Sequence, residues 1–334
     1  MASQQTAQST LGILLMAYGT PRNLDEVEAY YTHIRHGRPP TEQQLADLMR
    51  RYHAIGGISP LNDITAAEAR ELEAALNRDG GRPCKVYLGM KHAHPFIADA
   101  VARMAADGIT EAVTLVLAPH YSAMSVGQYQ KNADEAATAA RGLTLWHVDS
   151  WHLHPKFLRL IESRVQSALA RFANPDDVLV VFSAHSLPAR IIAAGDPYER
   201  QLHETGDAVA AALHLPRHRF AWQSAGRTAD TWLGPDILEV LRELAAEGTK
   251  QVLLCPVGFV SDHLEVLYDV DIEAQALARE LGVQLERTAS LNADPAFIET
   301  LRDVVRAREV QAAAAGRTSD VVRPGSQTGD EADA

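Results

Sequence analysis

The chain has 334 residues, 46% of them hydrophobic and 22% charged, which excludes a wholly disordered chain and a disulfide-stapled small domain. Its length suits two domains of ordinary size, and the formal net charge of −12 disfavours binding to nucleic acid. We find no apolar run long enough to span a membrane, no secretory signal, and two cysteines, Cys84 and Cys255. The absence of a secretory signal and the low cysteine count predict a cytoplasmic protein. We expect no iron–sulfur cluster, because such a cluster usually takes four ligands.

Two apolar runs predict buried parallel strands, each followed by a loop with polar side chains. After a polar arm over residues 1–9, which we expect to be flexible, residues 11–16 read LGILLM and the chain then turns at Gly19. Residues 178–182 read VLVVF and lead into SAHSLP. Aligning Pro21 with Pro188 places Tyr18 on His185, so the second segment resembles the first.

A second pair of segments repeats the same order of helix, glycine and strand. Residues 95–122 align with residues 235–261, so that Gly108 lies on Gly248. The repetition predicts an α/β fold of two Rossmann-like, doubly wound half-domains whose parallel sheets face a central cleft. Chance similarity between two ordinary strand–helix units is the alternative. We place the N-terminal domain at residues 10–165, the C-terminal domain at 166–306, additional material of the first half within 22–60, and a disordered tail at 307–334.

Polar side chains that follow the strands are the first candidates for a functional site. Ligands of such sheets bind beyond the carboxyl ends of the strands, so we expect Tyr18, His120, His185 and the segment after Pro256 to face the cleft. His185 can accept a proton or ligate a metal ion, with a purely structural histidine as the alternative. Glu265 follows a strand of the same half, so the two side chains are expected to converge as a base or a metal site.

Glu265, Asp269 and Glu273 are spaced four residues apart and form one column of carboxylates if the segment is helical. Like charges at this spacing repel one another, and a hard divalent cation would offset that cost. A solvated acidic helix face is the alternative. His92 and His94 are a weak candidate for a metal pair, because residues two apart on a strand point to opposite faces.

Residues 33–40, HIRHGRPP, form a basic segment in an acidic protein, and Arg50, Arg51 and Tyr52 follow. Guanidinium and phenol groups bind carboxylates, so the segment predicts a carboxylate-binding site, with ordinary surface ion pairs as the alternative. Ser183 and Ser186 lack the surroundings of a serine hydrolase nucleophile. The chain also has neither a P-loop nor a dinucleotide-binding glycine motif.

Seven motifs, in this order, resemble those of the ferrochelatase family: LLMAYGTP, YYTHIRHGRPP, RYHAIGGISPLN, GMKHAHPFI, FSAHSLP, TWLGPDI and PVGFVSDHLEVLYDVD. The resemblance covers about residues 11–305. It implies a two-domain, Rossmann-like chelatase that inserts Fe2+ into a porphyrin and needs no redox cofactor. Because it has Tyr18 within AYGTP, the chain resembles the soluble, monomeric branch of the family that uses coproporphyrin III.

The resemblance also implies roles for individual residues. His185 and Glu265 would be the catalytic pair that handles Fe2+ and the pyrrole protons, and Tyr18 would approach the iron from the opposite face of the ring. The propionates of the substrate would be bound by Arg35, Arg51, Tyr52, Ser59 and Tyr129. Asp269 and Glu273 would form an outer cation site, with Mg2+ as the candidate ion. His36 departs from the family pattern, in which arginine is common.

Three other functions stay open at this point: a protoporphyrin IX ferrochelatase, a cobalt or nickel chelatase, and a non-catalytic carrier of haem or metal. A cobalt or nickel chelatase usually presents paired histidines, and a carrier would bind its ligand without turnover. The expected partners are a porphyrin, ferrous iron and a downstream enzyme that processes coprohaem. We expect no nucleic acid and no membrane span.

Overall fold

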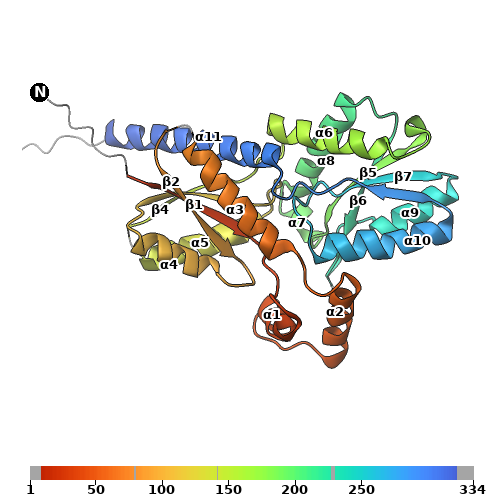
Figure 1. The fold of residues 1–334 in the computed structure, drawn as a ribbon, viewed down its shortest axis with the longest axis horizontal. Coiled ribbons are helices and arrows are strands. Elements are labelled where there is room, and N and C mark those ends of the chain that lie inside the picture. Colours follow the sequence, from red (N-terminus) through yellow and green to blue (C-terminus); the bar gives the residue numbers. More distant parts are fainter. Residues whose placement is uncertain (1–8, 79, 141, 227–229, 322–334) are drawn as a thin grey trace, which may run out of the picture.

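The structure is a computed structural model that describes residues 9–78, 80–140, 142–226 and 230–321. It contains two four-stranded parallel sheets (Figure 1). The first has the order β2-β1-β3-β4, with β1 at Leu11–Ala17, β2 at Cys84–Met90, β3 at Glu111–Val116 and β4 at Thr144–His147. The second has the order β6-β5-β7-β8, with β5 at Leu179–His185, β6 at His218–Gln223, β7 at Gln251–Cys255 and β8 at Gln284–Arg287.

Helices cover both faces of each sheet, as a doubly wound fold requires. Those that follow the first strands are α1 (Val27–Ile34), α2 (Glu42–Ala54), α3 (Leu61–Asn77), α4 (Ile97–Ala106) and α5 (Val126–Ala140). The second half has α6 (Pro155–Leu169), α7 (Arg190–Ala193), α8 (Tyr198–Ala212), α9 (Ile237–Ala246), the π-helix η3 (Val266–Ala274), α10 (Gln275–Leu281) and α11 (Pro295–Val321). Short 3-10 turns lie at Leu24–Glu26 and Pro175–Asp177. We call the first sheet with α1–α5 the first lobe, and the second sheet with α7–α10 the second lobe.

The internal repeat predicted from the sequence is confirmed by the identical strand order of the two sheets. Helices α4 and α9 occupy equivalent places, and each has ten residues. Each is followed by a glycine with positive φ, 76° at Gly108 and 89° at Gly248, a conformation that ends a helix at little cost only in glycine. The predicted α/β fold of two doubly wound half-domains is therefore correct.

The additional material of the first half is the helix pair α1 and α2, which lies between β1 and α3, within the predicted range 22–60. Helix α2 begins at a capping box in which Thr41 and Gln44 satisfy each other's backbone N–H groups. In Figure 1 the pair forms a separate projection below the sheets. Its side chains supply part of the site described below.

One hydrophobic core runs through both lobes. It contains Ile13 and Leu15 of β1 together with Val180 and Phe182 of β5, while two smaller clusters fill the opposite faces of the sheets. Helix α6 follows the first sheet in sequence but packs against β7 and α8 of the second lobe. Helix α11 follows the second sheet but packs against α3, β3 and β4 of the first lobe (Figure 1). The expected domain boundary at residue 165 therefore falls inside α6.

The chain beyond residue 306 differs from the expected disordered tail, because α11 continues to Val321. The alanine-rich sequence favours a helix, Ala312 is buried, and Arg308 Nε donates to the carbonyl oxygen of His147 at 2.7 Å. Residues 322–334, and residues 1–8 of the expected arm, lie outside the described residues.

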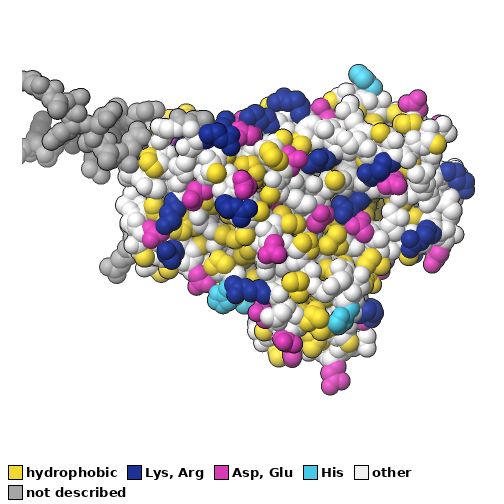
Figure 2. Space-filling view, viewed as in Figure 1, with side chains coloured by type: hydrophobic (Ala, Val, Ile, Leu, Met, Phe, Trp, Pro, Cys, Tyr) yellow, Lys and Arg dark blue, Asp and Glu magenta, His cyan; other side chains and the backbone are white. Residues whose placement is uncertain are grey.

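On the face shown in Figure 2, acidic and basic side chains are interspersed, so the acidic excess of the chain is not gathered into one patch there. Among the described residues, none of the helices combines the length and the apolar character that crossing a membrane requires.

Candidate active site

A cavity of about 970 Å3 lies at the carboxyl ends of the strands, between the two lobes. Tyr18, His120 and His185 line it, as expected from their places after β1, β3 and at the end of β5. The cavity brings together every side chain to which the family resemblance gave a role in catalysis, substrate binding or metal binding: Tyr18, Arg35, Arg51, Tyr52, Ser59, Tyr129, His185, Glu265, Asp269 and Glu273. Its volume is large enough for a ligand of several fused or linked rings.

His185 is the last residue of β5, and a backbone contact selects the tautomer of its neutral ring. Its Nδ1 lies within hydrogen-bond distance of the carbonyl oxygen of Ser186, which can only accept, so Nδ1 carries the proton. The lone pair of the neutral ring is then on Nε2, which lies 3.7 Å from Glu265 Oε1. This nitrogen is available to accept a proton or to ligate a metal ion.

The charges of His185 and Glu265 stabilise each other. Burial would lower the pKa of His185, but the Glu265 carboxylate, the Ser186 carbonyl and the charge of Asp269 together outweigh that effect, and the net shift is upward. Burial would raise the pKa of Glu265, but His185 and His263 shift it well below its ordinary value. Glu265 is therefore ionised, with His263 Nε2 3.6 Å from its Oε2.

Tyr18 follows β1 and lies on the wall of the same cavity. The next residue, Gly19, has a φ of 82°, and a Cβ there would meet the Cβ of Ala93 at 2.8 Å, so the turn after Tyr18 requires glycine. Burial and the charge of Glu265 raise the pKa of Tyr18 well above its ordinary value. Burial also raises the pKa of Tyr52 to about 12, and its hydroxyl lies 3.1 Å from Thr20 Oγ1. The phenols of this wall stay protonated at neutral pH.

The acidic segment after Glu265 is a helix, as the sequence analysis supposed, but a π-helix of nine residues, Val266–Ala274. Asp269 and Glu273 still line the cavity together with Glu265. The charge of Asp269 is partly balanced within the protein, because Arg51 Nη1 donates to Asp269 Oδ1 at 3.1 Å and Ser224 Oγ donates to Oδ2. Burial and the charge of Glu265 nevertheless raise the pKa of Asp269 to about 6.

The contact between Arg51 and Asp269 joins two residues for which the sequence predicted separate roles. Arg51 was expected to bind a propionate and Asp269 a cation, and here each is the other's partner across the two lobes. Among the described residues, no group of three or more His, Cys, Asp or Glu side chains is arranged to hold a metal ion. His92 and His94, the weak candidate for a metal pair, have different surroundings. His92 is buried against His33, whereas His94 is exposed and contacts Asp99.

The cavity also contains functional groups that the sequence analysis did not assign. Lys91, at the carboxyl end of β2, donates to Gln128 and lies 5.2 Å from the ring centroid of Tyr129. The same strand-end rule that identified His185 would have found it. The same rule covers Ser224, which directly follows β6, and His263, which lies in the segment after Pro256 that was expected to face the cleft. Their contacts with Asp269 and Glu265 had no such signal, because those contacts depend on how the loops fold.

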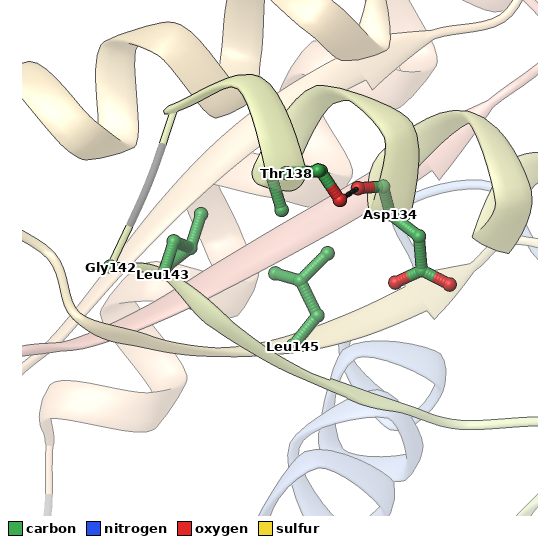
Figure 3. A pocket seen from close by; sticks show the side chains of 6 residues that line it. Asp134, Thr138, Gly142, Leu143 and Leu145 are labelled. Atoms are coloured by element: carbon green, nitrogen blue, oxygen red, sulfur yellow. Dashed lines mark hydrogen bonds between the residues drawn. The ribbon is translucent and has the colours of Figure 1, made fainter.

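A second pocket, of about 410 Å3, lies between the end of α5 and β4 (Figure 3). Its polar lining is small: the hydroxyl of Thr138 donates to the carbonyl oxygen of Asp134 in the same helix, and the Asp134 carboxylate contacts His147. None of the predicted site residues lines it. The chemistry of the molecule therefore lies in the larger cavity.

Solved structures with the same fold have been determined for sirohydrochlorin chelatases. SirB from Bacillus subtilis with Fe3+ superposes with a TM-score of 0.60 at 11% identity, over 92% of this chain and 98% of that one. SirB from Bacillus subtilis subspecies spizizenii in complex with cobalt gives 0.56 at 11% identity, over 90% and 95%. At this identity the likeness concerns the fold alone.

The chain is a two-lobed α/β protein with the fold of these solved chelatases and a cavity between its lobes. The chain belongs to the ferrochelatase family, whose profile matches residues 10–309. It is 50% identical to the ferrochelatase of Herpetosiphon aurantiacus, over 88% of this chain and 97% of that protein. It is 48% identical to the coproporphyrin III ferrochelatase of Geobacillus thermodenitrificans, over 90% and 97%. The ferrochelatase of Thermus thermophilus is 47% identical over 89% of this chain and 99% of that protein.

Proposed function

We propose that this protein inserts Fe2+ into coproporphyrin III to give coprohaem, with release of both pyrrole protons. The observation that carries the proposal is the His185 Nε2 lone pair beside the ionised Glu265, in one cavity with arginine and phenol side chains. Relatives named coproporphyrin III ferrochelatase, 46–48% identical over most of the chain, support the choice of porphyrin.

His185 is the proposed proton acceptor. Neutral His185 takes a pyrrole N–H proton at Nε2 while Nδ1–H stays bonded to the Ser186 carbonyl oxygen. The imidazolium that forms is stabilised by the Glu265 carboxylate. Two pyrrole protons leave for each Fe2+ that binds the ring nitrogens, so His185 releases the first proton to solvent before it accepts the second. The iron stays ferrous, so the reaction needs no electron donor or acceptor.

The basic wall is the proposed binding site for the substrate carboxylates. Arg35, His36 and Arg38 line the cavity from the segment around the end of α1, and Arg51 lines it from α2. Together with Ser59, Tyr52 and Tyr129 they offer charge and hydroxyl groups to a tetracarboxylate in an otherwise acidic protein. Anchoring at these groups can supply the energy to bend the ring and expose its nitrogen lone pairs, with Tyr18 on the face opposite His185.

The outer cation site at Asp269 and Glu273 stays part of the proposal. As placed, Asp269 is bonded to Arg51 and Ser224, so these residues fit Mg2+ only after Arg51 has left Asp269. We infer that Arg51 turns to a propionate when the porphyrin binds and thereby frees Asp269. Direct titration should show tighter Mg2+ binding to the porphyrin-loaded protein than to the free protein, and equal affinities would contradict this coupling.

The test of the function is anaerobic metal insertion, followed by the porphyrin absorbance with Fe2+ and either coproporphyrin III or protoporphyrin IX. Faster turnover of the tetracarboxylate supports the proposal. Preference for protoporphyrin IX would keep the chelatase but overturn the substrate. Binding of either porphyrin without turnover would favour a carrier.

The catalytic pair makes a separate prediction. His185→Ala should abolish insertion while the affinity for coproporphyrin III, measured by fluorescence quenching, changes by no more than about threefold.

In the unsubstituted enzyme, activity should fall as the pH drops through the raised pKa of His185, because the protonated ring cannot accept a proton. Glu265→Gln removes the charge that raises this pKa, so its acid limb should move to lower pH. An unmoved limb would remove Glu265 from this role.

We further propose that the protein acts in the cytoplasm as a monomer and passes coprohaem to a downstream enzyme. Cys84 and Cys255 are both buried free thiols, which suits a reducing compartment. Sedimentation of the purified protein tests the oligomeric state.

A further inference from the structure

Glu265 is held at the start of a helix type that rarely persists. It caps the nine-residue π-helix Val266–Ala274, whereas π-helical segments are mostly single turns inserted in α-helices. Contacts from outside the segment must therefore favour this form over an ordinary α-helix. The position of Glu265 relative to His185 depends on those contacts.

Arg287, the last residue of β8, contacts the chain on both sides of Glu265. Its Nε and Nη2 donate to the two carboxylate oxygens of Asp271, inside the π-helix, at 2.6 and 2.8 Å. The same Nη2 donates to Oδ1 of Asp262, which precedes the helix, at 3.1 Å. The side chains of Arg287 and Asp262 are 16% and 23% exposed and therefore largely shielded from water, whereas that of Asp271 is 36% exposed.

Asp262 is fixed further by the loop after β8. Ser290 Oγ donates to Asp262 Oδ1 at 2.7 Å, and Asn292 Nδ2 donates to Oδ2 at 3.1 Å. The backbone N–H of Asp262 donates to Asn292 Oδ1 at 2.8 Å. Arg287 itself donates from Nη1 to the Thr288 carbonyl oxygen at 3.1 Å. The end of β8 and this loop thus form a rigid support for residues 262–271.

We propose that Arg287 is a positioning residue for iron insertion, which holds Glu265 at its place beside His185 by clamping Asp262 and Asp271. The proposal rests on the proposed function. Arg287 is not among the residues that line the cavity, so it acts through Glu265 and not on the substrate. A single planar guanidinium binds two carboxylates at once, which the point charge of a lysine does not reproduce.

The clamp should affect iron and porphyrin differently. The side chains proposed for the propionates, such as Arg35, Ser59 and Tyr129, belong to the first lobe, whereas Arg287 acts on the second. Loss of the clamp should therefore displace Glu265 and leave Arg35, Ser59 and Tyr129 in place. Arg51, which also lines the basic wall, contacts the π-helix through Asp269, so the prediction rests on the other three residues. Such a split between the two substrates would not result from a general loss of stability.

The experiment compares Arg287→Lys with the unsubstituted protein in steady-state insertion of Fe2+ into coproporphyrin III. We expect the KM for Fe2+ to rise about tenfold, the usual lower range for loss of a residue that orients a metal ligand, with the KM for coproporphyrin III within about twofold. Arg219→Lys is the control, because Arg219 Nη2 donates to both carboxylate oxygens of Glu247 in an exposed pair away from the site. It should change neither constant.

Asp271→Asn provides a second variant in case Arg287→Lys folds poorly. It keeps the size of the side chain and the Arg287–Asp262 contact, so its effect on the KM for Fe2+ should have the same direction and be smaller. An unchanged KM for Fe2+ in both variants, or an equal rise of the KM for Fe2+ and the KM for coproporphyrin III, overturns the role of Arg287. Absence of turnover in the unsubstituted protein would instead overturn the proposed function.

Discussion

Glu68 is a carboxylic acid in the interior that no step of the proposed reaction uses. It lies on α3 with no solvent exposure, and its Oε1 accepts a hydrogen bond from Ser261 Oγ, in the loop after β7, at 2.6 Å. Its Oε2 has no partner in the described part of the chain. Burial raises the pKa of Glu68 to about 7, although the Ser261 hydroxyl acts in the opposite direction. The residue therefore titrates near neutral pH, at a contact between the two lobes.

Glu68→Gln should change how stability depends on pH. The folded pKa of Glu68 is higher than its unfolded value, so the folded protein loses stability as the pH rises from about 4.5 through about 7, by at most about 3 kcal/mol. Glutamine does not ionise, so the thermal midpoint of the variant should gain on that of the unsubstituted protein between pH 5 and pH 9. Glu71→Gln, on the exposed side of the same helix, is the control and should follow the unsubstituted protein. If the Glu68→Gln difference is constant over this range, Glu68 does not titrate there.

Tyr18, His185 and Glu265 could be predicted because each is at or after the end of a strand, and Arg35, Arg51 and Tyr52 because they belong to or follow the basic segment. Ser59 and Tyr129 were identified only through the resemblance to the ferrochelatase family. His185 and Glu265 converge, as parallel strands with a common carboxyl edge require. The pairing of Arg51 with Asp269 could not be predicted, since it joins residues of different lobes whose distance depends on the closed fold. The role of Glu68 in the interior was missed for the same reason.

At the scale of elements, the loop after β7 approaches β5 as closely as the backbone allows. A Cβ on Gly258 would lie 2.4 Å from the Cβ and 2.8 Å from the Cα of Ala184, the residue before His185. The Gly258 N–H donates to the Ser183 carbonyl oxygen at 3.0 Å. Glycine at this position brings the strand that carries His185 against the loop that leads to Glu265.

Gly258→Ala should therefore force the loop and β5 apart. We expect a loss of about 1–3 kcal/mol in the free energy of unfolding, together with slower iron insertion, because the His185–Glu265 distance changes. Gly81→Ala is the control, since a Cβ there has its nearest contact at 3.6 Å, an ordinary distance. Denaturant unfolding and turnover are measured for both. Gly258→Ala with unchanged stability and turnover would show that the loop adapts without cost.

The sequence predicted β1 from its continuous apolar run, and the structure shows that this strand is buried along its whole length. It predicted α4 and α9 from the pattern that the two segments share. The π-helix was not predicted, because a carboxylate at every fourth residue is compatible with an α-helix and a π-helix alike. The contacts that Arg287 makes with Asp271 in this helix and with Asp262 before it come from a residue later in the chain, so the local sequence does not show them.

At the scale of the whole molecule, α11 extends the core of the first lobe beyond the expected end of the folded chain. Arg308 bonds to the backbone of β4, and Ala312 is buried. Neither residue lies in the cavity. This part of the chain contributes stability and not chemistry.

Ending the chain after Arg306 should lower the free energy of unfolding by about 1–3 kcal/mol, through loss of the Arg308 hydrogen bond and of apolar contacts along α11. The kcat for iron insertion at 25 °C should stay the same. A chain that ends at Ala314 keeps both contacts and should match the full-length protein in thermal denaturation. Equal stability of the two truncated chains would restore the original expectation that the tail begins at residue 307.

The positions of α6 and α11 decide whether the two halves of the chain can be separated into fragments with complete sheets. Each sheet is covered on one face by a helix encoded in, or directly before, the other half of the chain. A cut at the point of the internal repeat would leave the first sheet without α11, and the second sheet without α6 if α6 stays with the first fragment. The first copy of the repeated unit is thus complete only when the second is present, whereas the second is complete by itself only if the cut leaves α6 with it.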